Sequence, residues 1–194
     1  MPLILAFDPG YRNLAYCAAV LGDAPDAPAR VAAWGVADMG AGFAKLGPME
    51  RGSVLRETLD GILEREIGAA WDRSEDTTVL VENQPSRASA AVRGVQLGIF
   101  MYMAMRRDLW GEPVRALQVS ARVKLRSHAR EEKRTYRDRK ATAVEAAGRL
   151  CEGCPDLTAR LAAAKKKDDM ADTLMYIAEH GGIAAFVHGG EEVG

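Results

Sequence analysis

The sequence lacks the features that mark membrane-spanning, secreted and disordered chains. Its uninterrupted apolar runs, such as residues 99–105, are all far shorter than the roughly 20 residues that span a bilayer. The apolar run at 3–7 is too short for a signal peptide. With 48% hydrophobic and 27% charged residues, and no repeat or low-complexity tract, the 194 residues predict one globular domain over 1–194.

Cysteine is also scarce. An odd set of three, Cys17, Cys151 and Cys154, does not form a disulfide framework, so we expect an intracellular, reducing compartment. Cys151 and Cys154 have the spacing of a zinc-binding pair, but no second Cys or His pair accompanies them. The cysteines therefore predict no metal site of their own.

The net charge of −1 conceals a strong asymmetry along the chain. Residues 1–82 hold 13 acids and seven bases, whereas residues 106–140 hold 12 bases and five acids. The basic segment is a candidate phosphate-binding surface, and a solvated helix face or an Arg-rich loop is the alternative.

The pattern of apolar residues predicts an α/β fold. Apolar runs bounded by Gly, Pro and Asp indicate strands at 3–7, 14–21, 31–36, 77–81 and 113–119, the first three forming a meander. Apolar residues at intervals of three and four indicate helices at 48–71, 89–110, 139–150 and 165–186. This order favours a five-stranded mixed sheet with helices on both faces.

Two carboxylates follow predicted core strands. Asp8 comes directly after the run at 3–7, and Glu82 directly after the run at 77–81. A carboxylate is costly there unless it is solvated, paired or bound to a metal. Since ligands collect at the carboxyl ends of parallel strands, neighbouring strands would bring the two together. Each residue taken alone has a simpler interpretation as a turn or cap residue.

A third acidic element lies at the start of the last predicted helix. At about 100° per residue, Asp168, Asp169 and Asp172 share one face, opposite Met170 and Leu174. An exposed acidic turn balanced by the preceding lysines is one interpretation. Carboxylates from three separate segments are also what a pair of Mg²⁺ ions requires, because hard cations take oxygen ligands.

Three segments carry a resemblance to a known family: LILAFDPGYRNLAYC, TVLVENQPSRAS and KKKDDMADTLMYI. In order and spacing they resemble the acidic motifs of the RuvC-like Holliday junction resolvases, most closely the poxvirus and yeast mitochondrial branch. The segment VSARVKLRSHAREEKRTYRDRKATAV is similar to the family's basic segment. The resemblance implies an RNase H-like fold and a Mg²⁺-dependent endonuclease that resolves four-way DNA junctions.

The same resemblance implies roles for individual residues. Four carboxylates match the family's metal ligands, namely Asp8, Glu82, Asp169 and Asp172, while Asp168 is either a further ligand or a neighbour of the ligands. They would hold two Mg²⁺ ions, replaceable by Mn²⁺, one activating a water and the other stabilising the leaving 3′ oxygen. The basic segment would supply the DNA contacts, through Arg122, Lys124, Arg126, Arg130, Lys133, Arg134, Arg137, Arg139 and Lys140.

Lys124 and Lys140 match lysines that the family places near the scissile phosphate, where a cation offsets transition-state charge. Ordinary contacts to the DNA backbone are the alternative for both. The expected partner is branched DNA, with no membrane and no small-molecule substrate. Viral, organellar and bacterial origins all remain open.

Other functions fit parts of the sequence. Another RNase H-like nuclease, acting on flaps or RNA–DNA hybrids, would keep the same carboxylates. A non-catalytic DNA-binding protein would not need the acidic cluster at 168–172. An actin-like phosphate-binding module would need a second Asp-x-Gly phosphate loop and a chain roughly twice as long.

Paired, symmetric cuts in a four-way junction require two active sites, so we expect a homodimer. The predicted helix at 89–105 offers a row of small residues, Ala90, Gly94 and Gly98, followed by Met101 and Met105. The row would let a second helix approach closely. The alternative is that the small residues face the protein's own sheet.

Overall fold

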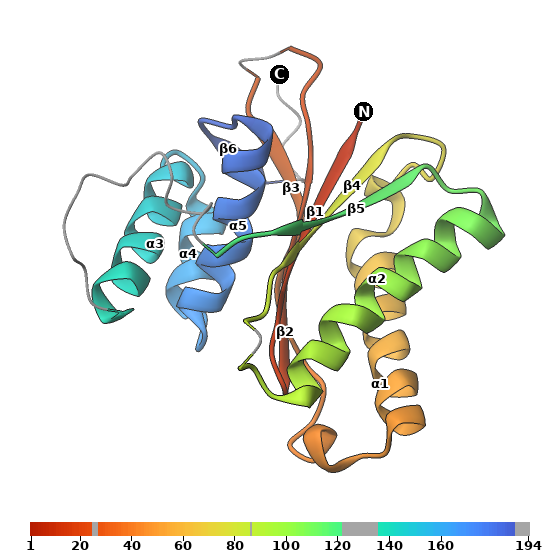
Figure 1. Ribbon diagram of the computed structural model, residues 1–194. Coiled ribbons are helices and arrows are strands. Elements are labelled where there is room, and N and C mark those ends of the chain that lie inside the picture. Colours follow the sequence, from red (N-terminus) through yellow and green to blue (C-terminus); the bar gives the residue numbers. More distant parts are fainter. Residues whose placement is uncertain (25–26, 86, 122–135, 189–194) are drawn as a thin grey trace.

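The computed structural model describes residues 1–24, 27–85, 87–121 and 136–188, and all statements on structure refer to these. They form a six-stranded sheet in the order β5-β4-β1-β2-β3-β6 with helices on both faces (Figure 1). The strands are β1 (Leu3–Pro9), β2 (Asn13–Val20), β3 (Ala29–Asp38), β4 (Thr77–Glu82), β5 (Val114–Val119) and β6 (Phe186–His188). The predicted α/β class is thus confirmed.

The strand pairing is mixed. β1, β2 and β3 form the predicted antiparallel meander. β4 is parallel to β1 on one side and to β5 on the other. The short β6 runs parallel to β3 at the other edge. The carboxyl ends of β1 and β4 therefore lie side by side.

The five helices divide into two layers (Figure 1). α1 (Pro48–Asp60) and α2 (Ala90–Trp110) cover one face, and α3 (Tyr136–Leu150), α4 (Pro155–Ala163) and α5 (Lys167–Gly181) cover the other. Alternate residues of β1 serve the two cores, because side chains alternate across a strand. Leu3, Leu5 and Phe7 enter the core with α1 and α2, whereas Ile4 and Ala6 enter the core with α5.

The predicted helix at 48–71 is wrong in detail. α1 ends at Asp60 and continues as the π-helical segment η2 (Gly61–Ile67) and the short 3₁₀ turn η3 (Gly68–Ala70). The predicted apolar stripe is buried throughout, including Ile62, Ile67 and Trp71. Burial of the stripe thus fixes which side faces the core, but not the type of helical turn.

The predicted helix at 165–186 and the five-strand count are also wrong. α5 ends at Gly181, because Gly182 takes a left-handed conformation with φ +64°, which residues other than glycine rarely adopt. The chain then forms β6, the sixth strand, against Ala29–Val31. α4 was not predicted; it begins with Pro155, a residue favoured in the first turn of a helix.

The two glycines in the small-residue row of α2 have different surroundings. A Cβ on Gly98 would lie 2.5 Å from Leu55 Cδ2 of α1, so Gly98 packs within its own chain. A Cβ on Gly94 would meet nothing within 4 Å. The prediction that both glycines face a second copy is therefore wrong for Gly98, whose small size is needed for the α1–α2 contact.

Two further findings concern the described residues. None of their helices is long and apolar enough to cross a membrane. Cys17, Cys151 and Cys154 are free thiols buried in the core beneath α3, α4 and α5.

Candidate metal centre

The sheet places Asp8 and Glu82 next to each other. Phe7 of β1 pairs with Val81 of β4 in parallel register, so the following residues of the two strands are neighbours. Phe7 and Val81 point into the core with α1 and α2. Strand alternation therefore directs the next residues, Asp8 and Glu82, to the opposite face, where α5 lies. The predicted meeting of these two carboxylates is observed.

The turn after Asp8 is short and requires glycine. The Gly10 amide donates a hydrogen bond to the Asn13 carbonyl at 2.9 Å. A Cβ on Gly10 would lie 2.5 Å from that same oxygen. A larger residue would displace the turn, and with it the end of β1 that carries Asp8.

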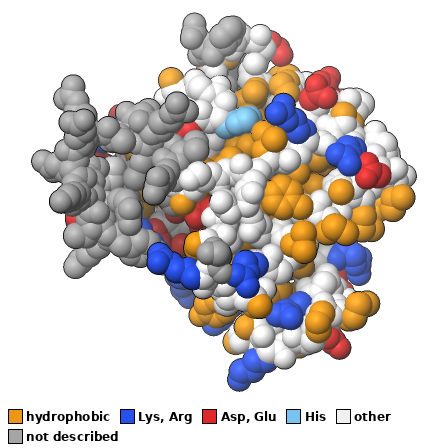
Figure 2. All heavy atoms as spheres, viewed as in Figure 1, with side chains coloured by type: hydrophobic (Ala, Val, Ile, Leu, Met, Phe, Trp, Pro, Cys, Tyr) orange, Lys and Arg blue, Asp and Glu red, His pale blue; other side chains and the backbone are white. Residues whose placement is uncertain are grey.

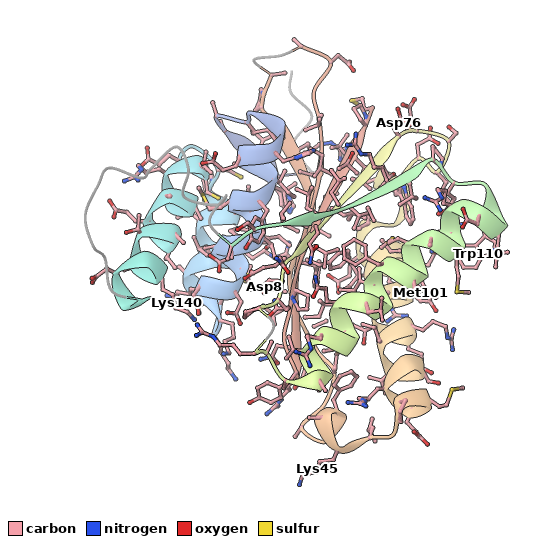
Figure 3. All side chains as sticks on the ribbon, viewed as in Figure 1. Asp8, Lys45, Asp76, Met101, Trp110 and Lys140 are labelled. Carbon is pink, nitrogen blue, oxygen red and sulfur yellow. The ribbon has the colours of Figure 1, made fainter. Side chains whose placement is uncertain are left out.

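α5 adds the third carboxylate. Its apolar residues, including Leu174 and Ile177, pack on β1 and β2 and hold the helix against the sheet. Asp172, in the second turn, is only 7% exposed. Carboxylate oxygens of Asp8, Glu82 and Asp172 all lie within 4.8 Å of one another. Three segments remote in sequence thus contribute to one acidic cluster, of which Asp8 is labelled in Figure 3.

The cluster is electrostatically unfavourable without a cation. Burial, together with the neighbouring Glu82 and Asp172 carboxylates, raises the pKa of Asp8 well above its usual value. Glu82 Oε2 is buried and has no hydrogen-bond donor among the described residues. Closely spaced oxygen donors with an unsatisfied buried atom fit a hard divalent cation such as Mg²⁺.

Asp168 and Asp169 lie outside this cluster. Asp168 forms an ion pair with Lys140 of α3, and Asp169 lies 3.9 Å from Lys166 Nζ. Burial and the adjacent Asp168 raise the pKa of Asp169. Asp169 still contributes to the raised pKa of Asp8, so it lies close enough to act on the cluster electrostatically.

Most of the predicted DNA-binding residues lie outside the described residues. These are Arg122, Lys124, Arg126, Arg130, Lys133 and Arg134. Arg137 and Arg139 belong to the first turns of α3. Lys140, which follows them, is the member of this set whose side chain the structure describes. The basic segment therefore leads directly into the helix that packs against α5.

One residue of the site was not predicted. Tyr176 is buried on α5, one turn after Asp172. Its burial is the main cause that raises the pKa of its hydroxyl, and the Glu82 carboxylate raises it further. Its hydroxyl thus lies close to the acidic cluster. The i, i+4 spacing from Asp172 was a signal for this placement, because such residues share a helix face.

The comparisons with known proteins concern the fold. No protein-family model and no curated protein matches the chain. Among solved structures, RuvC of T. thermophilus in complex with a Holliday junction substrate matches over 92% of each chain, with 15% identity and a TM-score of 0.53. T. thermophilus RuvC alone matches with 16% identity over 92% of this chain and 94% of that chain, with a TM-score of 0.52.

A third solved structure is the yeast mitochondrial Holliday junction resolvase Ydc2. It matches 92% of this chain and 77% of its own, with 16% identity and a TM-score of 0.54. At identities this low, the structural match establishes the fold alone, and it confirms the expected resemblance at that level. The chain has the RNase H-like fold of the RuvC and Ydc2 resolvases.

Proposed function

We propose that the protein is a divalent-metal-dependent endonuclease that resolves four-way DNA junctions and related branched DNA. The observation that carries this proposal is the cluster of Asp8, Glu82 and Asp172, with oxygens within 4.8 Å of one another. The solved structures with the same fold support the choice of substrate, because Ydc2 is a Holliday junction resolvase and one RuvC structure contains a Holliday junction substrate.

The three carboxylates, joined by Asp169, would hold Mg²⁺ or Mn²⁺. A pair of such ions supplies Lewis-acid activation of water and stabilisation of the leaving oxygen in phosphodiester hydrolysis. The protein's part is to fix the oxygen donors on rigid elements, two strand ends and one helix. Before a cation binds, these carboxylates repel the phosphate backbone, so cleavage and productive DNA binding both depend on the metal.

The basic segment would provide the opposing attraction. Its lysines and arginines carry a surplus of positive charge that the acidic first part of the chain lacks. Contacts between such residues and phosphates supply affinity that falls with salt concentration.

Paired cuts require two copies, and α2 supplies a surface for the second one. Its outer side exposes a continuous apolar stripe (Figures 2 and 3). The residues are 46–69% exposed: Leu97, Met101, Met105, Leu109 and Trp110. Gly94 extends the stripe without a side chain. An exposed apolar stripe of this length is typical of a protein interface.

The junction also constrains how two copies would pack. Both acidic clusters must face one side of the dimer to cut symmetric strands. α2 begins soon after Glu82 and runs back along the sheet toward Pro113, which bonds to the start of β4 (Figure 1). A two-fold axis that keeps both clusters on one side would therefore be parallel to α2. The two copies of α2 would then pack in parallel, and Met101 would contact Met101 of the second copy.

The central test compares cleavage of a synthetic four-way junction, a flap, an RNA–DNA hybrid and a linear duplex, with and without Mg²⁺. We expect Mg²⁺-dependent, paired cuts in the junction. Asp172→Asn should abolish cleavage while junction binding persists, and Asp76→Asn, an exposed change at the other end of β4, should have no effect. Equal cleavage of the hybrid would favour a different nuclease, and binding without any cleavage would favour a non-catalytic DNA-binding protein.

The dimer is tested separately by Met101→Cys. The three native cysteines are at most 1% exposed, so they do not compete for oxidation. A disulfide-linked dimer that still cuts junctions would support parallel packing of α2. A variant that stays monomeric under oxidation, while the wild type is dimeric, would contradict this arrangement.

A further inference from the structure

The carboxylates of α5 divide between two kinds of partner. Asp172 is only 7% exposed and joins the acidic cluster with Asp8 and Glu82. Asp168, one turn earlier, forms an ion pair with Lys140 of α3, and these two side chains are 25% and 38% exposed. The acidic motif of α5 therefore does more than supply metal ligands.

The ion pair brings a cation next to Asp168 and Asp169, in the helical turn before Asp172. Lys140 acts electrostatically on Asp169 as well, although burial and Asp168 keep the pKa of Asp169 raised. For Asp168, burial raises the pKa, but the hydrogen bonds to the carboxylate and the charge of Lys140 together outweigh it, so the pKa falls below its usual value. Asp168 is thus a carboxylate already neutralised by a cation of the protein itself.

We propose that Asp168 is a positioning residue, which holds the Lys140 ammonium near Asp169, one turn before Asp172 of the acidic cluster, and does not bind metal. The proposal rests on the proposed nuclease function and assigns the residue whose role the sequence left open. A lysine ammonium at the end of a flexible four-carbon stem samples many positions unless a fixed partner holds it. Asp168 is such a partner, because it lies in the first turn of a helix that packs on the sheet.

The position matters for catalysis through charge. Lys140 acts electrostatically on Asp169, and preorganised positive charge beside metal-binding carboxylates would stabilise the negative charge that develops on a phosphodiester. The pair also ties the first turns of α3 to the first turn of α5 (Figure 3).

The test uses the full-length protein and five variants in single-turnover cleavage of a four-way junction. Asp168→Asn should lower the maximal rate about tenfold, because Lys140 is misplaced but still present. Asp168→Glu should restore much of that rate. Lys140→Met should lower the rate by about a hundredfold, and adding Asp168→Asn to it should change the rate by less than about twofold. Glu152→Gln, which changes an exposed acid in the turn after α3, is the matched control and should cleave as the wild type does.

A second measurement does not depend on cleavage. Mg²⁺ should raise the melting temperature of Asp168→Asn as much as that of the wild type, whereas Asp172→Asn should lose most of this rise. Loss of the rise in Asp168→Asn would overturn the proposal and make Asp168 a metal ligand. Rate losses that add when Asp168→Asn and Lys140→Met are combined would also overturn it.

NMR of lysine ammonium groups separates this proposal from the nuclease function. The Lys140 ammonium signal, identified by its absence in Lys140→Met, should be slowed in exchange in the wild type and lost in Asp168→Asn. An unchanged signal would overturn the positioning role. If the wild type cuts no branched DNA, the nuclease proposal fails, while the NMR and melting measurements still decide whether Asp168 holds Lys140 and leaves the metal alone.

Discussion

Replacing Asp8 with Asn should stabilise the metal-free protein while abolishing the proposed cleavage activity. Asp8 shares a partly buried cluster with Glu82 and Asp172. Asn has nearly the same shape, carries no charge, and its amide can donate a hydrogen bond to the Glu82 carboxylate. The substitution therefore removes repulsion without opening a cavity.

The size of the effect follows from the geometry. Two unit charges 4.8 Å apart repel by about 3.5 kcal/mol at an effective dielectric constant of about 20. Asp8 has two such neighbours, but the raised pKa of Asp8 means that the cluster relieves part of this repulsion by retaining a proton. We therefore expect a net gain of about 2 kcal/mol in the free energy of unfolding, or about 4–8 °C in melting temperature for a chain of this length.

The sign of the pH dependence follows from the same pKa. The folded protein binds the Asp8 proton more tightly than the unfolded chain, in which the pKa is about 3.9. The wild type therefore loses stability as pH rises above that value, toward the raised pKa of the folded state. Asp8→Asn removes this loss, so its advantage should be absent in acid and largest in mildly alkaline buffer.

The assay is thermal unfolding in a chelator, followed by titration with Mg²⁺. The wild type should gain stability as Mg²⁺ is added, and Asp8→Asn should gain little, so the two curves converge or cross. The exposed Asp76→Asn serves as the control for loss of one negative charge. A variant less stable than the wild type at mildly alkaline pH without metal would refute the reasoning, as would an undiminished response to Mg²⁺.

Three further predictions concern other parts of the molecule. Arg106 is 2% exposed and pairs with the buried Glu112 at 2.6 Å, so Arg106→Met should cost about 3–5 kcal/mol in urea unfolding, and adding Glu112→Gln should recover much of it. Gly94→Leu should give a folded monomer that nicks junctions without pairing its cuts, whereas Gly98→Leu should lower the melting temperature; a Gly94→Leu dimer in light scattering would contradict the interface. Alanine should also replace three arginines of the basic segment, Arg134, Arg137 and Arg139. This change should flatten the salt dependence of junction binding, by about 0.9 in the slope of log K against log salt for each lost phosphate contact. An unchanged slope would exclude the basic segment as the DNA-binding surface.

The sequence predicts best where one physical requirement dominates. The strands containing Phe7 and Val81 are recognisable because continuous apolar runs are needed in a sheet covered on both faces. Asp8 and Glu82 then stand out as the first charged residues after those runs. These local signals suffice to predict that two carboxylates meet at one edge of the sheet.

The parts of the fold and of the site that the sequence does not predict depend on contacts between distant residues, which the spacing of apolar residues does not encode. The end of α5 is set by the left-handed backbone at Gly182, and β6 exists only because β3 offers it an edge. The role of Gly98 depends on Leu55, a residue 43 positions earlier in the chain. Likewise, no spacing rule assigns Asp168 to Lys140, since that pair arises from the packing of α3 on α5.

The alternation of side chains along β1 explains how so small a protein can carry both the proposed dimer surface and the acidic cluster. Its odd-numbered residues, such as Phe7, anchor the layer of α1 and α2, whose outer side bears the apolar stripe. Its even-numbered residues, such as Ala6, anchor the layer of α5 and end in Asp8. A shift of one residue in the pairing of β1 would exchange the two faces and move Asp8 away from Asp172. The register of this central strand therefore couples the proposed dimer surface to the acidic cluster, because one pairing pattern must satisfy both.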